Sequence, residues 1–157
     1  MPTAIYFDMD GTIADLYGYE GWLEGLLSED VTPYSACAPL FDTSLLDALR
    51  MLQGMGVRVG VISWGCKDSS RSYLARTRHA KASWLKAHGF PCDELHVIQY
   101  GKPKAACAHV KNGSVLVDDN EAVRSEWANG DGRTAIPPTE CVEFVKGLIL
   151  GLQDLAA

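Results

Sequence analysis

Two carboxylates follow a short apolar segment near the start of the chain. Ala4–Phe7 is apolar throughout, and Asp8, Asp10 and Gly11 come directly after it. We expect the segment to be a buried strand, and side chains two positions apart in an extended chain point to the same side. Both carboxylates can then face one small volume, which suits a divalent cation and a phosphoryl group. The alternative is a surface turn with two solvated aspartates.

A second pair of carboxylates repeats this pattern later in the chain. Asp118 and Asp119 follow the aliphatic run Val115–Val117. Such pairs are also common in surface turns, but here three aliphatic residues lead directly into the pair. In parallel sheets, ligands bind beyond the carboxyl ends of the strands. The sequence therefore predicts that both pairs of aspartates lie at one edge of a sheet.

A serine closes another apolar run. Ser63 ends the segment Val59–Ser63, and Trp64 and Gly65 follow it. A hydroxyl at this place can donate to a phosphate oxygen, and nearby backbone N–H groups can form an anion-binding nest. A serine at a strand end is also a common turn former, so this signal gains weight only from the other motifs.

Two lysines lie just beyond a fourth strand candidate, Glu94–Gln99. Lys102 precedes Pro103, which biases Lys102 to an extended backbone that can point back over the strand ends. Lys104 follows the proline, where a helix is expected to begin. We expect Lys102 to be the lysine that neutralises a bound phosphate, with Lys104 as its rival. Two surface lysines are the alternative.

Composition limits the classes of function. The chain has 157 residues, 47% hydrophobic and 22% charged, which is typical of one soluble globular domain. The net charge of −6 argues against nucleic acid as a tight partner.

Five scattered cysteines without a C-x-x-C pair suggest neither a disulfide framework nor a zinc site, and fit reduced thiols in the cytoplasm. No signal peptide or membrane span is expected.

Strand and helix patterns alternate along the chain, which predicts an α/β fold with a parallel sheet covered on both faces. The expected strands are Thr3–Phe7, Val57–Ser63, Glu94–Gln99, Ser114–Val117 and, more weakly, Arg133–Ile136. The expected helices are Ser44–Met55, Ser72–His88, Lys104–Val110, Glu121–Ala128 and Glu140–Leu155. Thr32-Pro33 and Ala38-Pro39 indicate irregular chain before the first of these helices.

The motifs occur in the order found in the haloacid dehalogenase (HAD) superfamily of phosphatases. Asp8-Met9-Asp10-Gly11-Thr12 resembles the first motif of that superfamily, Ser63 the second, Lys102-Pro103 the third and Asp118-Asp119 the fourth. The resemblance covers Thr3 to about Trp127. It implies a three-layer Rossmann-like fold with a parallel sheet of about five strands, helices on both faces, and a small or absent cap.

The resemblance also implies roles for these residues in phosphomonoester hydrolysis. Asp8 would attack phosphorus and form an aspartyl-phosphate, and Asp10 would act as general acid and then as general base. Ser63 and Lys102 would hold the phosphate oxygens.

A Mg2+ cofactor is implied as well. It would be held by Asp8, the backbone carbonyl of Asp10, and Asp119. Asp118 would orient the lysine or a metal-bound water. We expect Trp64, Gly65 and Lys104 to contact the substrate or to support the residues that do.

A closer resemblance within the superfamily is to the 5′(3′)-deoxyribonucleotidase branch. It rests on three segments, Asp8–Asp15, His79–His88 and Val115–Asp119. This chain departs from that branch between Gly18 and Phe41, where the nucleotidases carry a larger helical cap. We expect one domain over residues 1–157 with a short cap-like insert at about 15–41. The aromatic residues of the insert could stack on a base or pack as a lid: Tyr17, Tyr19, Trp22 and Tyr34.

Three functions remain open at this point. A phosphatase acting on a nucleotide or another small phosphate ester is the first. A phosphatase acting on a macromolecular end, such as a nucleic-acid 3′ phosphate or a phosphoprotein, is the second, because a thin cap leaves the site open. A non-catalytic binding module that kept the fold is the third, although both Asp8 and Asp10 are present.

Overall fold

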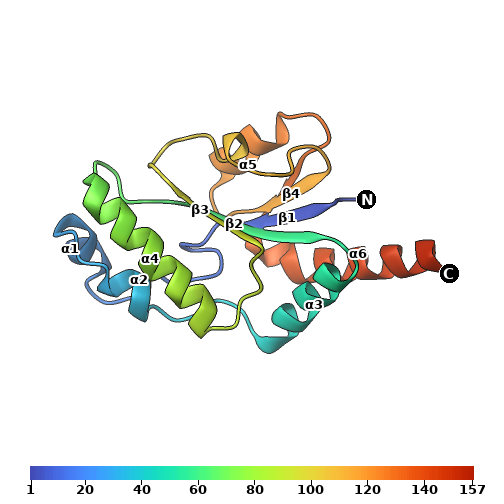
Figure 1. Ribbon diagram of the computed structural model, residues 1–157, viewed down its shortest axis with the longest axis horizontal. Helices are drawn as coiled ribbons and strands as arrows, with labels where there is room; N and C mark the ends of the chain where they lie inside the picture. The colour runs from blue at the N-terminus through green and yellow to red at the C-terminus, as the bar shows by residue number, and fades with distance from the viewer.

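Five parallel strands form the centre of the computed structural model, which describes residues 1–157 (Figure 1). The strands are β1 (Ala4–Phe7), β2 (Arg58–Trp64), β3 (Glu94–Ile98), β4 (Ser114–Val117) and β5 (Thr134–Ile136). Their order in the sheet is β3-β2-β1-β4-β5, and every neighbouring pair is parallel. Every residue of β1 and β4 is buried, as expected for strands covered on both faces.

Helices cover both faces of this sheet, which confirms the three-layer α/β fold. The helices are α1 (Trp22–Leu27), α2 (Thr32–Ala36), α3 (Thr43–Gly54), α4 (Arg71–Ala87), α5 (Glu121–Ala128) and α6 (Cys141–Ala156). One core cluster joins alternate residues of β1, β2 and β4 to α3, α4 and α6. The cluster on the opposite face joins Tyr6 and Leu116 to Val123 and Trp127 of α5. In Figure 1, α5 lies above the sheet and α3 and α6 lie below it.

The central strand β1 determines where the functional groups meet. Phe7 of β1 is paired with Val61 of β2 on one side and with Val117 of β4 on the other. Asp8 and Asp118 are the next residues after Phe7 and Val117, so both begin at the same level of the sheet. The chain runs outward from β1 to β3 and then returns to β4, which makes the β1–β4 boundary the switch point where ligands bind in such sheets.

The insert between β1 and α3 is more ordered than its sequence suggested. Residues 15–41, where Thr32-Pro33 indicated irregular chain, contain the two short helices α1 and α2. Leu16, Leu26 and Tyr34 of the insert pack against Tyr73 and Ala80 of α4. Helices this short are not stable alone in water, so contact with α4 explains their formation.

The expected helix Lys104–Val110 is wrong in length. Only a single 3-10 turn forms, η1 (Lys104–Ala106). The backbone N–H of Val110 donates to the hydroxyl of Tyr6 at 3.0 Å, instead of to a helical carbonyl. The segment after η1 is therefore attached to the sheet by side-chain contacts.

Each helix is too short or too polar to cross a membrane bilayer.

Candidate active site

A buried lysine joins the two pairs of aspartates at the β1–β4 boundary. Lys104 Nζ donates to Asp8 Oδ1 at 2.5 Å and to Asp118 Oδ2 at 2.7 Å. All three residues are buried, with Lys104 only 3% exposed. Although burial alone would lower it, the carboxylates of Asp8 and Asp118 hold the pKa of Lys104 above its usual value. The site therefore contains a fixed ammonium beside the first carboxylate.

The assignment of this lysine corrects the sequence prediction. Lys102 was expected to face the carboxylates, but its side chain is exposed, and its hydrogen bonds are made by its backbone: the carbonyl accepts from the indole N–H of Trp64 at 2.9 Å, and the N–H donates to the Gln99 carbonyl at 3.2 Å. Pro103 precedes the η1 turn, and this turn directs Lys104 inward. Asp118 contacts this lysine, as the resemblance implied for the acidic neighbour.

A second buried lysine, Lys81 of α4, contacts Asp10 and was missed by the sequence analysis. Lys81 Nζ donates to Asp10 Oδ2 at 2.6 Å, to Ser63 Oγ at 2.7 Å and to the carbonyl oxygen of Trp64 at 3.1 Å. Its side chain is completely buried. A signal did exist: Lys81 falls at helical spacing from Tyr73 and Thr77, on the face of α4 that is buried. A lysine on that face requires a buried partner.

Ser63 occupies a different place from the one expected for a phosphate ligand. Its side chain is fully buried and its hydroxyl accepts the hydrogen bond from Lys81. It does not line the cavity described below. The structure therefore shows Ser63 supporting Lys81, and direct contact of Ser63 with phosphate stays a prediction.

Asp119 is held by the loop that follows β1. Thr12 Oγ1 donates to Asp119 Oδ1 at 3.2 Å, and the backbone N–H of Asp119 donates to Thr12 Oγ1 at 3.1 Å. Gly11 permits this approach, because it has φ +81° and a Cβ there would lie 2.7 Å from Asp119 Oδ2. The glycine of the first motif thus has a steric role.

Three carboxylates converge in this region: oxygens of Asp8, Asp118 and Asp119 lie within 4.8 Å of one another. Burial, followed by the negative charge of Asp8, raises the pKa of Asp118 to about 6 and raises that of Asp119. Lys104 offsets only part of this repulsion. A hard cation such as Mg2+ takes oxygen ligands of this kind, so the donor set fits the metal that the resemblance implied.

The pKa of Asp10 is also shifted. Burial raises it, the Lys81 ammonium opposes the rise, and the charge of Asp8 adds to it, with a net upward direction. An upward shift of the pKa is the direction that a carboxyl group needs to act as a general acid.

A cavity of about 410 Å³ opens onto these groups. Its polar floor contains Asp8, Asp10, Lys104, Asp118 and Asp119. Its apolar wall comes mainly from the insert and includes Leu16, Tyr17, Trp22, Leu23, Leu26, Leu27 and Tyr34. The expected contributors Trp64 and Gly65 line it too, and the ring of Trp64 lies 4.9 Å from that of Tyr100, centroid to centroid. Of the aromatic residues expected in the insert, Tyr19 instead packs against the main core.

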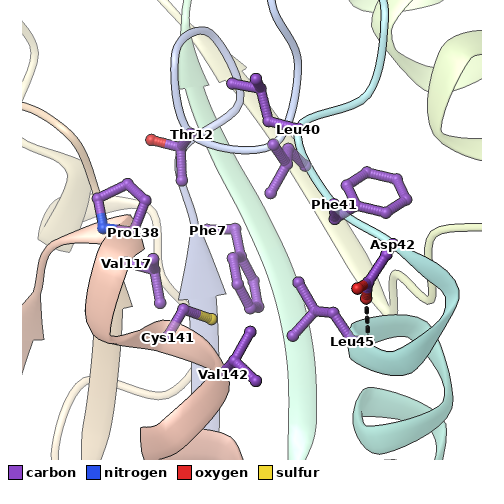
Figure 2. A pocket seen from close by; sticks show the side chains of 11 residues that line it. Phe7, Thr12, Leu40, Phe41, Asp42, Leu45, Val117, Pro138, Cys141 and Val142 are labelled. Carbon is purple, nitrogen blue, oxygen red and sulfur yellow. Dashed lines mark hydrogen bonds between the residues drawn. The ribbon is translucent and has the colours of Figure 1, made fainter.

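A smaller pocket of about 160 Å³ lies between the start of α3 and the start of α6 (Figure 2). Its lining is mostly apolar, and Figure 2 shows Phe7, Leu45 and Val142 pointing into it. Its acidic residue, Asp42, accepts a hydrogen bond from the backbone N–H of Leu45 and so caps α3. This pocket lacks the groups for phosphoryl chemistry.

Comparisons with known proteins agree on the fold. No protein-family model matches the chain, and no curated protein sequence matches it. Among solved structures, a protein of unassigned function from Corynebacterium glutamicum is similar, with a TM-score of 0.55 and 15% identity over 95% of this chain and 96% of that one.

Two further structures share the fold, and one of them is named as a HAD-like phosphatase. A provisionally named HAD-like phosphatase from Mesorhizobium loti gives a TM-score of 0.52 and 16% identity, covering 96% of this chain and 87% of that one. A chain from the Pnkp1/Rnl/Hen1 complex gives a TM-score of 0.57 and 19% identity, covering 87% of this chain and 46% of that one. At these identities the likeness shows that the chain shares its α/β fold with these three proteins.

Proposed function

We propose that this chain is a Mg2+-dependent phosphomonoester hydrolase that acts through an aspartyl-phosphate on Asp8. One observation carries the proposal: Asp8, Asp10, Lys104, Asp118 and Asp119 meet on the floor of one cavity at the carboxyl ends of β1 and β4. The fold shared with a provisionally named HAD-like phosphatase supports it.

The chemistry needs two displacements at phosphorus. In the first, a carboxylate oxygen of Asp8 bonds to phosphorus, the bond to the leaving oxygen breaks, and Asp10 gives its proton to that oxygen. In the second, Asp10 takes a proton from water, the water oxygen bonds to phosphorus, and the bond to Asp8 breaks. Lys104 offsets the repulsion between carboxylate and phosphate in both steps. Mg2+, held by Asp8 and Asp119 with Asp118 beside them, would supply further positive charge when bound.

The leaving group is proposed to carry a planar ring that can stack on aromatic side chains. Tyr17, Trp22 and Tyr34 line the same cavity as the carboxylates, so a group attached to the phosphate would meet aromatic side chains. A nucleoside 5′- or 3′-monophosphate fits this description, in line with the nucleotidase-like segments. The apolar wall favours such a small ester over a polymer end.

The proposal is tested by measuring inorganic phosphate released from a panel of esters, with and without Mg2+. Nucleoside monophosphates and an aryl phosphate should be hydrolysed, and glycerol phosphate should be a poor substrate. A preference for 3′-phosphorylated oligonucleotides would favour the polymer-end function. Absence of turnover on every ester in the presence of bound Mg2+ would favour the non-catalytic module.

We expect activity to require Mg2+ and to fall at least about 100-fold in Asp119→Ala, by analogy with the loss of one transition-state stabilising group. Protons compete with the metal for these carboxylates, and the pKa of Asp118 is about 6. The dissociation constant for Mg2+ should therefore rise as the pH falls below about 6. Calorimetric titration at several pH values measures this. Full activity in excess chelator would contradict the assignment.

We expect Lys81→Met to move the pH optimum upward, because the Lys81 ammonium is the group that opposes the rise in the pKa of Asp10. The profile of kcat/KM against pH measures the shift. Lys86→Met on the same helix is the control, since Lys86 is exposed and should leave the profile unchanged. An unchanged profile in Lys81→Met would mean that Asp10 is not the titrating acid.

A further inference from the structure

A cluster of one carboxylate and two imidazole side chains lies at β3 and the segment after η1, outside the cavity. Glu94 is the first residue of β3, His96 follows two positions later, and His109 lies in the segment after η1. His96 Nε2 lies 2.8 Å from Glu94 Oε2, and His109 Nδ1 lies 3.4 Å from the same oxygen. The three ligand atoms all fall within 4.8 Å of one another. Two imidazoles and a carboxylate thus converge on one point.

A hydrogen bond to its other oxygen, Oε1, holds the Glu94 carboxylate in place. Tyr6 of β1 reaches across the intervening strand and donates its hydroxyl hydrogen to Glu94 Oε1 at 2.6 Å. This contact is possible because Gly60 of β2 has no side chain: a Cβ there would lie 2.6 Å from the Tyr6 ring and 3.0 Å from Glu94 Cγ. The hydroxyl of Tyr6 is itself fixed by the N–H of Val110. Such support of a ligand by a further hydrogen bond is typical of metal sites.

The charges around the group permit a cation. Oε1 of Glu94 accepts the hydrogen bond from Tyr6, so Oε2 is the oxygen that faces the two imidazoles. The nearest positive side chain, Arg58, lies 4.0 Å from Oε1, the oxygen that faces away from the histidines. His109 is 72% exposed and His96 is 28% exposed, which leaves the point of convergence open to solvent.

We propose that Glu94, His96 and His109 form a second cation site, selective for a nitrogen-preferring metal such as Zn2+. Imidazole ligands suit Zn2+ and disfavour Mg2+, whereas the all-oxygen cluster of Asp8, Asp118 and Asp119 has the opposite preference. Three protein ligands leave a fourth position for water, as in open zinc sites. The ion would join β3 to the segment that carries Lys104 at one end and His109 at the other, and would so stabilise the folded chain.

The test is calorimetric titration of the protein with Zn2+ in saturating Mg2+, which occupies the carboxylate cluster. We expect one Zn2+ per chain, with affinity reduced at least tenfold in His109→Ala and in Glu94→Gln. The other two histidines of the chain, His79 and His88, supply matched controls: His79→Ala and His88→Ala should bind Zn2+ like the parent. Because His109 is exposed, its replacement should leave the fold intact even if Glu94→Gln does not fold.

Two further measurements distinguish this site from Zn2+ binding at the carboxylate cluster or at a cysteine. At a hundredfold excess over its dissociation constant, Zn2+ should raise the Tm by about 5 °C or more, and His109→Ala should lose this rise. Co2+ in place of Zn2+ should show no sulfur-to-metal charge-transfer band, since no cysteine is among the ligands. Unchanged Zn2+ affinity in His109→Ala, loss of Zn2+ in Asp119→Ala, or a thiolate band would each overturn the proposal. None of these outcomes depends on phosphatase activity.

Discussion

Asp8→Asn is expected to abolish turnover while the fold stays intact. The change is nearly isosteric and removes the charge that would attack phosphorus, so kcat should fall about 10⁴-fold or more, which is about 5 kcal/mol in barrier height. Phosphate release under saturating Mg2+ measures the loss. Residual activity within about tenfold of the parent would contradict the assignment of Asp8 as the nucleophile.

The same variant should not be less stable near pH 7. The pKa of Asp118 is raised to about 6 by burial and by the charge of Asp8. A carboxyl group with a raised pKa stabilises the fold at low pH, and that stabilisation is lost as the pH rises through 6. Removing the charge of Asp8 makes ionised Asp118 less unfavourable in the folded chain at neutral pH. Lys104 keeps Asp118 as its partner. The Tm of Asp8→Asn in chelator should equal or exceed that of the parent.

Lys104→Met is expected to lower kcat/KM by about 10²–10³-fold, the effect of removing one group that stabilises transition-state charge. The lysine that the sequence favoured is the matched control. Lys102→Met removes an exposed side chain and keeps the backbone carbonyl that accepts from Trp64, so its kcat/KM should stay within about twofold of the parent. A larger loss in Lys102→Met than in Lys104→Met would restore the sequence assignment.

Thermal unfolding should separate the two lysine variants as well. Lys104 is the cation in contact with Asp8 and Asp118. Without it, these buried carboxylates repel each other, so the Tm of Lys104→Met should fall in chelator and partly recover in Mg2+. The Tm of Lys102→Met should not change in either condition.

The sheet and its carboxylates were predictable because each rests on a local pattern. The apolar runs that end at Phe7 and Val117 predict two buried strands, and the aspartates that follow them need only the rule that parallel strands end at one edge. Boundaries of the expected strands agree with the observed ones within one or two residues. These features require no knowledge of distant contacts.

The two lysines show where local patterns fail. Lys102 and Lys104 are two positions apart, and the choice between them depends on the direction of one turn, which formed as η1 instead of the expected helix. Lys81 depends on tertiary packing, because only the docking of α4 places its side chain beside Asp10. Helices α1 and α2 were missed for the same reason, since their stability comes from contact with α4.

The central position of β1 has a consequence for synthesis on the ribosome. β1 is the first strand to be made, yet its partner β4 comes much later: Thr3, next to β1, is bonded to Gly113, 110 residues away. Until β4 emerges, one edge of an entirely apolar strand has no neighbour, and such an edge is prone to association with other chains. Nascent chains that stop before Ser114 lack both the strand partner and the second pair of aspartates. Shielding of Ala4–Phe7 by a holdase chaperone during translation would therefore raise the yield of folded protein.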